Sequence, residues 1–229
     1  FPWWVRAVEQ AWHLFAVAEG AEALRHAEKI LEHHFETLDE ELICRLYRAW
    51  SVTADIARNS AAMQDTITKL LRLGAVRSSA LLKGTAYLIM ADLNLSQGEF
   101  VKGETNSQLA VSYLTTSSNQ YQLSYAYASL GVFQYLQNQV NAALQTLETA
   151  LRGISSPGNQ LELMARANIY YQIGMAHMLN GWPGLGKQDA DQCLDDYQSI
   201  GQLEGTLAAH SLLTICNYFH GNIPASITA

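Results

Sequence analysis

The sequence repeats itself at an interval of about 40 residues, and this period limits the folds open to the chain more than any other feature. In the clearest unit, apolar residues recur at helical spacing on both sides of a short polar break at Asn138 and Gln139. This pattern predicts two amphipathic helices folded against each other. Gly131, Ala143 and Ala150 are small where the two helices would cross, so the backbones can approach closely.

A small residue at the same point of the first helix marks six units along the chain. Its occupants are Ala11, Ser51, Ala91, Gly131, Gly174 and Thr214. Successive separations are 40, 40, 40, 43 and 40 residues. The excess of three residues coincides with the segment Ser155-Ser156-Pro157-Gly158, where we expect a longer loop, because solenoids tolerate insertions in loops.

The period predicts one all-α domain, a right-handed superhelical solenoid of about five antiparallel helix hairpins plus one terminal helix. The expected repeats are residues 2–38, 39–77, 78–117, 118–157, 158–201 and, incomplete, 202–229. Gly98 and Gly181 fall at hairpin turns, where a residue free to adopt positive φ can end the first helix.

The pair Leu130-Gly131, followed by Ala143, Leu147 and Ala150, resembles the tetratricopeptide repeat. The period of 40 is similar to that of repeats in large bacterial signalling proteins. There, such repeats accompany diguanylate cyclase (GGDEF), adenylate cyclase or helix-turn-helix output domains, as in activators of the maltose-regulon type. The resemblance implies a non-catalytic protein-binding or sensory module that regulates an output domain, although a fold alone does not establish a function.

The composition of the chain limits which kinds of partner and which cellular compartment can be expected. With 14 basic against 21 acidic side chains, the net charge of −7 argues against nucleic-acid binding. No apolar run is long enough for a transmembrane helix. Cys44, Cys193 and Cys216 are far apart in sequence, which favours free thiols in a reducing, cytoplasmic compartment. The chain begins at Phe1 without an initiator Met, so we expect a segment of a longer protein.

Charged residues are distributed unevenly. Residues 1–104 contain 25 charged side chains and residues 105–229 contain 10, with none between Thr105 and Leu147. That stretch is rich in Gln, Ser, Asn and Tyr but keeps a helical period, which argues against a disordered linker. We expect it to be folded and partly shielded from water by a partner.

Two motifs of catalytic or metal-binding type are present only in part. Gly181, Gly186 and Lys187 have the spacing of a phosphate-binding loop, but Gln188 replaces the required Ser or Thr, and a predicted helix rather than a strand precedes them. A hairpin turn is therefore expected there. His26 and His33 lie on one predicted helix without the converging ligands that zinc needs, so a solvated face is favoured. We expect no catalytic residue, metal or cofactor.

The candidate binding groove follows from the register, because the first helices of such solenoids line the concave surface. Its expected residues are Trp12, Phe15, Arg45, Arg48, Asp55, Asp92, Tyr125, Tyr135, Asn168, Tyr171, Met175, Met178, Tyr218 and Phe219, with Val5, Val8 and Leu88 beside them. Exposed Tyr and Met suit a peptide, a partner helix or a neutral small molecule. The alternative, that each of these residues packs in the core, stays open.

Three functional hypotheses follow. The leading one is a module that binds a protein or peptide and regulates an output domain. The second is a small-molecule sensor of a transcriptional activator, which would show an enclosed pocket near Tyr125, Tyr135 and Tyr171. The third is self-association into a homodimer through the apolar groove or the incomplete sixth unit.

Overall fold

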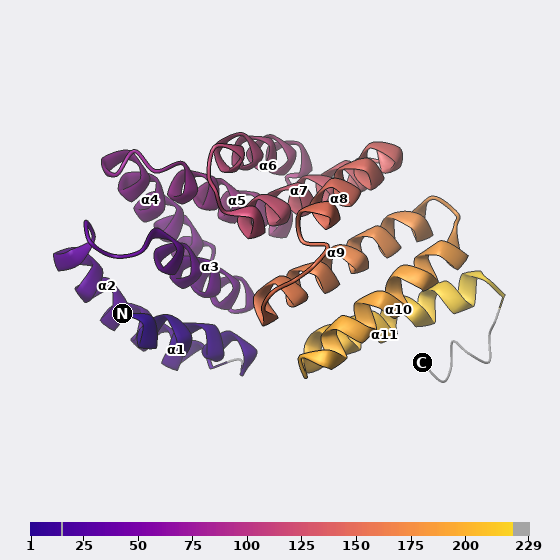
Figure 1. The fold of residues 1–229 in the computed structure, drawn as a ribbon, viewed down its shortest axis with the longest axis horizontal. Coiled ribbons are helices and arrows are strands. Elements are labelled where there is room, and N and C mark those ends of the chain that lie inside the picture. The colour runs from indigo at the N-terminus through magenta and orange to yellow at the C-terminus, as the bar shows by residue number, and fades with distance from the viewer. Residues whose placement is uncertain (15, 222–229) are drawn as a thin grey trace. The chain divides into compact units, whose positions relative to one another are not determined.

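The computed structural model describes residues 1–14 and 16–221, and these residues form eleven helices without a strand (Figure 1). The side chains of residues 12 and 13 are also outside the described part. The helices are α1 (Pro2–His13), α2 (Val17–His34), α3 (Glu40–Ile56), α4 (Ser60–Val76), α5 (Ala80–Ser96), α6 (Phe100–Thr115), α7 (Gln120–Leu136), α8 (Val140–Gly153), α9 (Gln160–Leu179), α10 (Pro183–Ser199) and α11 (Leu203–Phe219).

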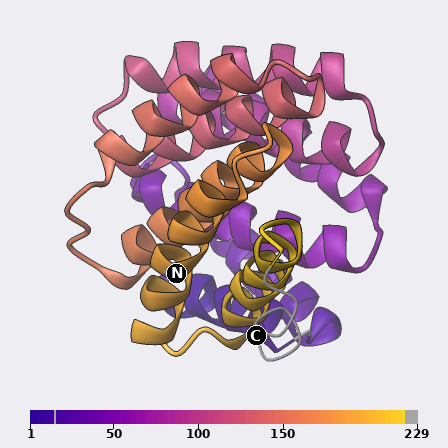
Figure 2. The same cartoon turned by 90° about the vertical axis from the view of Figure 1, so that its right-hand side faces the viewer.

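Consecutive helices pack as hairpins, with α1 on α2, α3 on α4, α5 on α6, α7 on α8 and α9 on α10. Helix α11 packs against both α9 and α10, as Figure 2 shows. The predicted all-α solenoid of helix hairpins is therefore confirmed. In the described residues, no helix has the length and apolar character that crossing a bilayer requires.

The chain divides into two compact units, residues 1–119 and residues 120–229. In the first unit, the first helices of the hairpins, α1, α3 and α5, lie side by side. In the second unit, α9 lies beside both α7 and α11. We call each of these groups a first-helix layer. The assignment of all six repeats to one domain stays a prediction.

The hairpin turns repeat with the same period as the sequence. A residue with positive φ follows each first helix from α3 onward: Arg58 (52°), Gly98 (72°), Asn138 (64°), Gly181 (77°) and Gly221 (79°). The prediction for Gly98 and Gly181 is confirmed. Arg58 and Asn138 adopt the same conformation although they are not glycine. The position within the repeat, rather than the residue type, therefore determines the positive φ at this turn.

Small residues permit the close crossing of paired helices, as predicted. A Cβ atom added to Gly131 would lie 2.6 Å from Cγ of Leu147, and one added to Gly186 would lie 2.9 Å from the carbonyl oxygen of Gly174. The longer loop is also confirmed, because α8 ends at Gly153 and α9 begins only at Gln160.

Side-chain caps fix where several helices begin. Asp39, Asn59, Ser79 and Asn159 each accept a hydrogen bond from a backbone N–H in the first turn of the following helix. Each such cap contributes about 1 kcal/mol of helix stability. The caps therefore help to keep the repeats in register.

Candidate functional site

In the first unit, the charged residues of the first-helix layer form ion pairs between neighbouring helices. Both nitrogens Nε and Nη2 of Arg45 in α3 donate to the Glu9 carboxylate in α1, at 2.8 and 2.9 Å. Nη1 of Arg48 donates to Oδ2 of Asp92 in α5 at 2.5 Å. These pairs join α1 to α3 and α3 to α5, so Arg45, Arg48 and Asp92 stabilise the layer while remaining partly exposed. Glu9 was not predicted.

Asp55 occupies the last turn of α3 and is exposed. Partial burial raises the pKa of its carboxyl, and the negative charge of Asp92 adds to the effect. Ser96 and Arg58 act in the opposite direction, Ser96 through a side-chain hydrogen bond and Arg58 through its charge. A carboxylate in a last turn also faces the negative end of the helix dipole. The ionised form of Asp55 is thus unfavourably placed.

In the second unit, five of the predicted residues lie half-buried on neighbouring helices. These are Tyr125 in α7 and Asn168, Tyr171, Met175 and Met178 in α9. Tyr171, Met175 and Met178 pack against a core cluster formed by α10 and α11 while keeping part of their surface open. They can therefore contribute both to the core and to a contact with a partner.

Several residues expected on an open face belong to the core instead. Tyr135 is only 9% exposed, its hydroxyl donates to Oε1 of Gln172 at 2.7 Å, and burial raises its pKa to about 12. Val5, Val8 and Leu88 are fully buried. The helical period identifies the face of a helix but not its depth of burial, which depends on the neighbouring helices.

Two predicted residues cannot be placed. The side chain of Trp12, in α1, and the whole of Phe15 lie outside the described residues.

The last two predicted residues, Tyr218 and Phe219, are exposed at the end of α11, by 61% and 64%, with their rings edge to face 5.5 Å apart. Leu203 and Leu207 on the same helix are exposed by 73% and 59%. Helix α11 thus carries exposed apolar side chains along its length, which is a feature of surfaces that contact a partner.

Two polar pairs in the second unit were not found by sequence reasoning. Arg166 donates from Nε and Nη2 to both carboxylate oxygens of the buried Asp196, at 2.8 and 2.7 Å. Nδ1 of His177 lies 2.6 Å from Oδ2 of Asp189. Both pairs join α9 to α10 within one hairpin. Their members are 30 and 12 residues apart, so only the packing of the hairpin reveals them.

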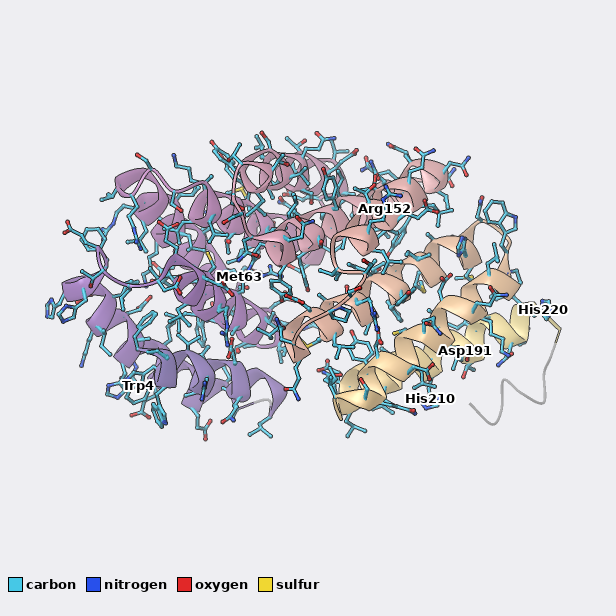
Figure 3. The ribbon with its side chains drawn as sticks, in the orientation of Figure 1. Trp4, Met63, Arg152, Asp191, His210 and His220 are labelled. Atoms are coloured by element: carbon cyan, nitrogen blue, oxygen red, sulfur yellow. The ribbon has the colours of Figure 1, made fainter. Side chains whose placement is uncertain are left out.

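The segment that partly matches a phosphate-binding loop is a hairpin turn, as predicted. Gly181 adopts positive φ, Pro183 begins α10, and Gly186 is buried inside that helix against α9. Within the described residues, no group of three or more His, Cys, Asp or Glu side chains is placed to hold a metal ion. His26 instead stacks on Trp4, with ring centroids 4.4 Å apart (Trp4 is labelled in Figure 3).

A cavity of about 630 Å³ lies in the first unit, where the turns between consecutive repeats meet. Its lining residues are Asp39–Glu41, Arg77–Leu81 and Thr116–Asn119. Glu40 accepts from Arg77 at 3.2 Å and from the Ser79 hydroxyl at 2.6 Å. Asp39 caps α3, and acidic residues are favoured at a helix N-terminus. This cavity is lined by none of the tyrosines around which an enclosed small-molecule pocket was expected.

The three cysteines are free and buried. Burial raises the pKa of Cys44 and Cys193 to about 12 and that of Cys216 to about 11. The thiolate is the reactive form, so these thiols are poor nucleophiles near neutral pH.

The sequence matches no known family model and no curated protein. Solved structures do resemble the fold. RapI in its apo form aligns with a TM-score of 0.65 at 10% identity, over 98% of this chain and 62% of RapI. BtubC (BKLC) from P. vanneervenii aligns with a TM-score of 0.64 at 12% identity, over 93% of this chain and 85% of BtubC.

A third solved structure is described by its repeats. The STAND protein PH0952 from Pyrococcus horikoshii, which has a tetratricopeptide repeat sensor, aligns with a TM-score of 0.61 at 8% identity. The match covers 88% of this chain and 30% of that protein. At such identities the likeness concerns the fold alone. Together with the helix hairpins described above, it shows that the chain has the fold of tetratricopeptide-like helical solenoids.

Proposed function

We propose that the chain is a non-catalytic module that binds a protein or peptide on its first-helix layers. The observation that carries the proposal is the set of half-buried Tyr125, Tyr171, Met175 and Met178 on α7 and α9. Aromatic side chains supply much of the energy of protein interfaces, and Met adapts its shape to different partners. These residues keep open surface although burying them fully would stabilise the fold.

The module regulates an output domain of a longer bacterial signalling protein, for which a GGDEF diguanylate cyclase is one candidate. The description of PH0952 as having a repeat sensor supports a sensory role. In a stack of hairpins each repeat contacts only its neighbours. A ligand that changes the packing between two neighbouring repeats therefore also changes the position of the repeat at the end of the stack. The three buried free thiols support a reducing, cytoplasmic setting, and the net charge of −7 argues against nucleic acid as the partner.

The test is selection of peptides on the purified chain from a displayed random library. Selected peptides should lose affinity when Tyr171→Ala or Met175→Ala removes half-buried surface from α9, by about 1–2 kcal/mol for each truncation. Asp191→Ala is the matched control, because Asp191 is exposed on α10 (labelled in Figure 3). Selection of no peptide, or of peptides that Asp191→Ala weakens as much as Tyr171→Ala, would contradict the proposal.

Self-association is a second candidate function, favoured by the exposed apolar side chains of α11. A homodimer would bury Leu203, Leu207 and Tyr218 against a second copy. Analytical ultracentrifugation over a range of concentrations should then show a dimer that Leu207→Lys dissociates and Leu185→Lys, in α10, does not. A monomer at all concentrations would exclude this function.

A further inference from the structure

We propose that α11 pairs with α11 of a second copy in antiparallel orientation, about a two-fold axis that passes beside Ser211. This inference rests on self-association, the second candidate function above, and specifies the surface, the orientation and the register of the contact. The contacting surface is a row of exposed residues at intervals of four along α11: Leu203, Leu207, Ser211, Ile215 and Phe219. We call this row the α11 stripe.

The α11 stripe is symmetric about its central residue. Ser211 is the middle residue of the helix, and large apolar side chains lie four and eight residues to either side of it. Residues four apart on a helix are neighbours on its surface, so the five form one continuous row. In an antiparallel pair centred on Ser211, Leu207 lies beside Ile215 of the second copy, and Leu203 lies beside Phe219 of the second copy. Each large side chain thus meets another apolar one, as a self-complementary two-fold contact requires.

The stripe exposes enough apolar surface for a stable dimer. Its large side chains are exposed by 36% at Ile215 to 73% at Leu203, and the adjacent Tyr218 is exposed by 61%. Together with Tyr218 they expose about 600 Å² per copy, since a large apolar or aromatic residue has about 200 Å² of surface when fully exposed. Pairing two copies therefore covers about 1,200 Å², the lower end of the range for specific interfaces.

Ser211 suits the centre of such a contact because it is small and its hydroxyl already has a partner. The hydroxyl donates to the carbonyl oxygen of Leu207 at 2.9 Å, within the helix. Covering Ser211 with apolar surface therefore leaves no unpaired donor, which would otherwise oppose association. A small residue at the crossing also lets two helix backbones approach closely, as Gly174 and Gly186 do between α9 and α10.

The charge of α11 favours the antiparallel orientation. Glu204 is the single Asp, Glu, Lys or Arg residue in the sequence of the helix, and it lies seven residues before Ser211. In an antiparallel pair the two Glu204 side chains lie at opposite ends, about 20 Å apart along the helix axis, beyond the Debye length of about 8 Å at physiological ionic strength. A parallel pair would place the two carboxylates side by side, where like charges repel.

Disulfide trapping tests the orientation and the register. Cys44, Cys193 and Cys216 are buried, so they do not compete with a thiol introduced on the exposed face of α11. Ser211→Cys should form a covalent dimer under mild oxidation, because the two-fold axis places position 211 of both copies face to face. Glu204→Cys is the matched control, since position 204 is also exposed but its two copies lie about 20 Å apart. Equal trapping of both variants, or no trapping of Ser211→Cys, would overturn the inference.

Charge substitutions test the expected neighbours in solution. Leu207→Lys and Ile215→Glu should each raise the Kd of the dimer at least about tenfold in analytical ultracentrifugation, because each places two charges against apolar surface. The chain with both substitutions should dimerise more tightly than either single variant, since every Lys then lies beside a Glu of the second copy. Circular dichroism should show unchanged helicity, because both positions are exposed in the single chain.

The outcomes separate this inference from the self-association on which it rests. A monomeric unchanged chain would contradict both. A dimer that neither single variant weakens would pair through another surface. A double variant that dimerises no more tightly than the single variants would exclude this register. Either of the last two results would overturn the inference and leave self-association standing.

Discussion

The close crossing of α9 and α10 gives a sharp prediction, because two glycines of α10 lie in opposite surroundings. A Cβ atom at Gly186 would meet the carbonyl oxygen of Gly174 at 2.9 Å and Sγ of Cys216 at 3.1 Å. A backbone oxygen cannot move aside as a side chain can. Gly186→Ala must therefore separate the two helices, at a cost of about 1–3 kcal/mol.

Gly184 is the matched control, two residues earlier in the same helix. Its added Cβ would meet only Cε1 of His220, at 3.8 Å, an ordinary contact. Alanine is a better helix former than glycine, so Gly184→Ala should gain up to about 1 kcal/mol. Gly186→Ala has the same gain in helix propensity but also the cost of the clash. The free energies of unfolding of the two variants should therefore differ by about 2 kcal/mol.

Urea unfolding followed by circular dichroism measures the difference as a shift of the transition midpoint. Gly184→Ala should unfold at higher urea than the unchanged chain, and Gly186→Ala at lower urea. If Gly186→Ala proved as stable as Gly184→Ala, the close crossing of the hairpin, and with it the packing inferred from the repeat, would be refuted.

Three further predictions concern turns, ion pairs and thiols. Arg58→Gly should stabilise the chain by about 0.5–1 kcal/mol, because glycine adopts positive φ without strain. At the equivalent turn, Gly98→Ala should destabilise the chain for the same reason. A loss of stability in Arg58→Gly would contradict this prediction. Arg166→Ala should cost about 2–3 kcal/mol, because it leaves the buried Asp196 carboxylate unpaired; a urea midpoint that does not move would show that the pair contributes little. Cys44, with its pKa raised to about 12, should react with a thiol reagent near neutral pH only after unfolding, and rapid labelling of the native chain would show that it is accessible.

The sequence predicted the architecture well because small residues recur at the positions where paired helices cross closely. Gly131 and Gly174 mark such crossings, and their separation of 43 residues located the longer loop before α9. The turns were found only where the residue is glycine. Arg58 and Asn138 adopt positive φ at the same point of the repeat, and only the distance of 40 residues from Gly98 could have identified them.

The candidate site was predictable in position but not in exposure. The register placed Tyr125, Tyr135 and Tyr171 on first helices, yet Tyr135 is buried and bonded to Gln172, while the other two keep open surface. The depth of each side chain depends on how adjacent hairpins pack, which the helical period does not contain. The pair of Arg45 with Glu9 illustrates the same limit, because it joins residues 36 positions apart.

The central claim is that the first-helix layers bind the partner. It is tested most directly by hydrogen exchange of the chain with and without a selected peptide, read by mass spectrometry. Slower exchange in α3 and α5 or in α7 and α9, with no change in the paired second helices α4, α6, α8 and α10, is the predicted result. Protection confined to those second helices or to the turns between repeats would contradict the claim.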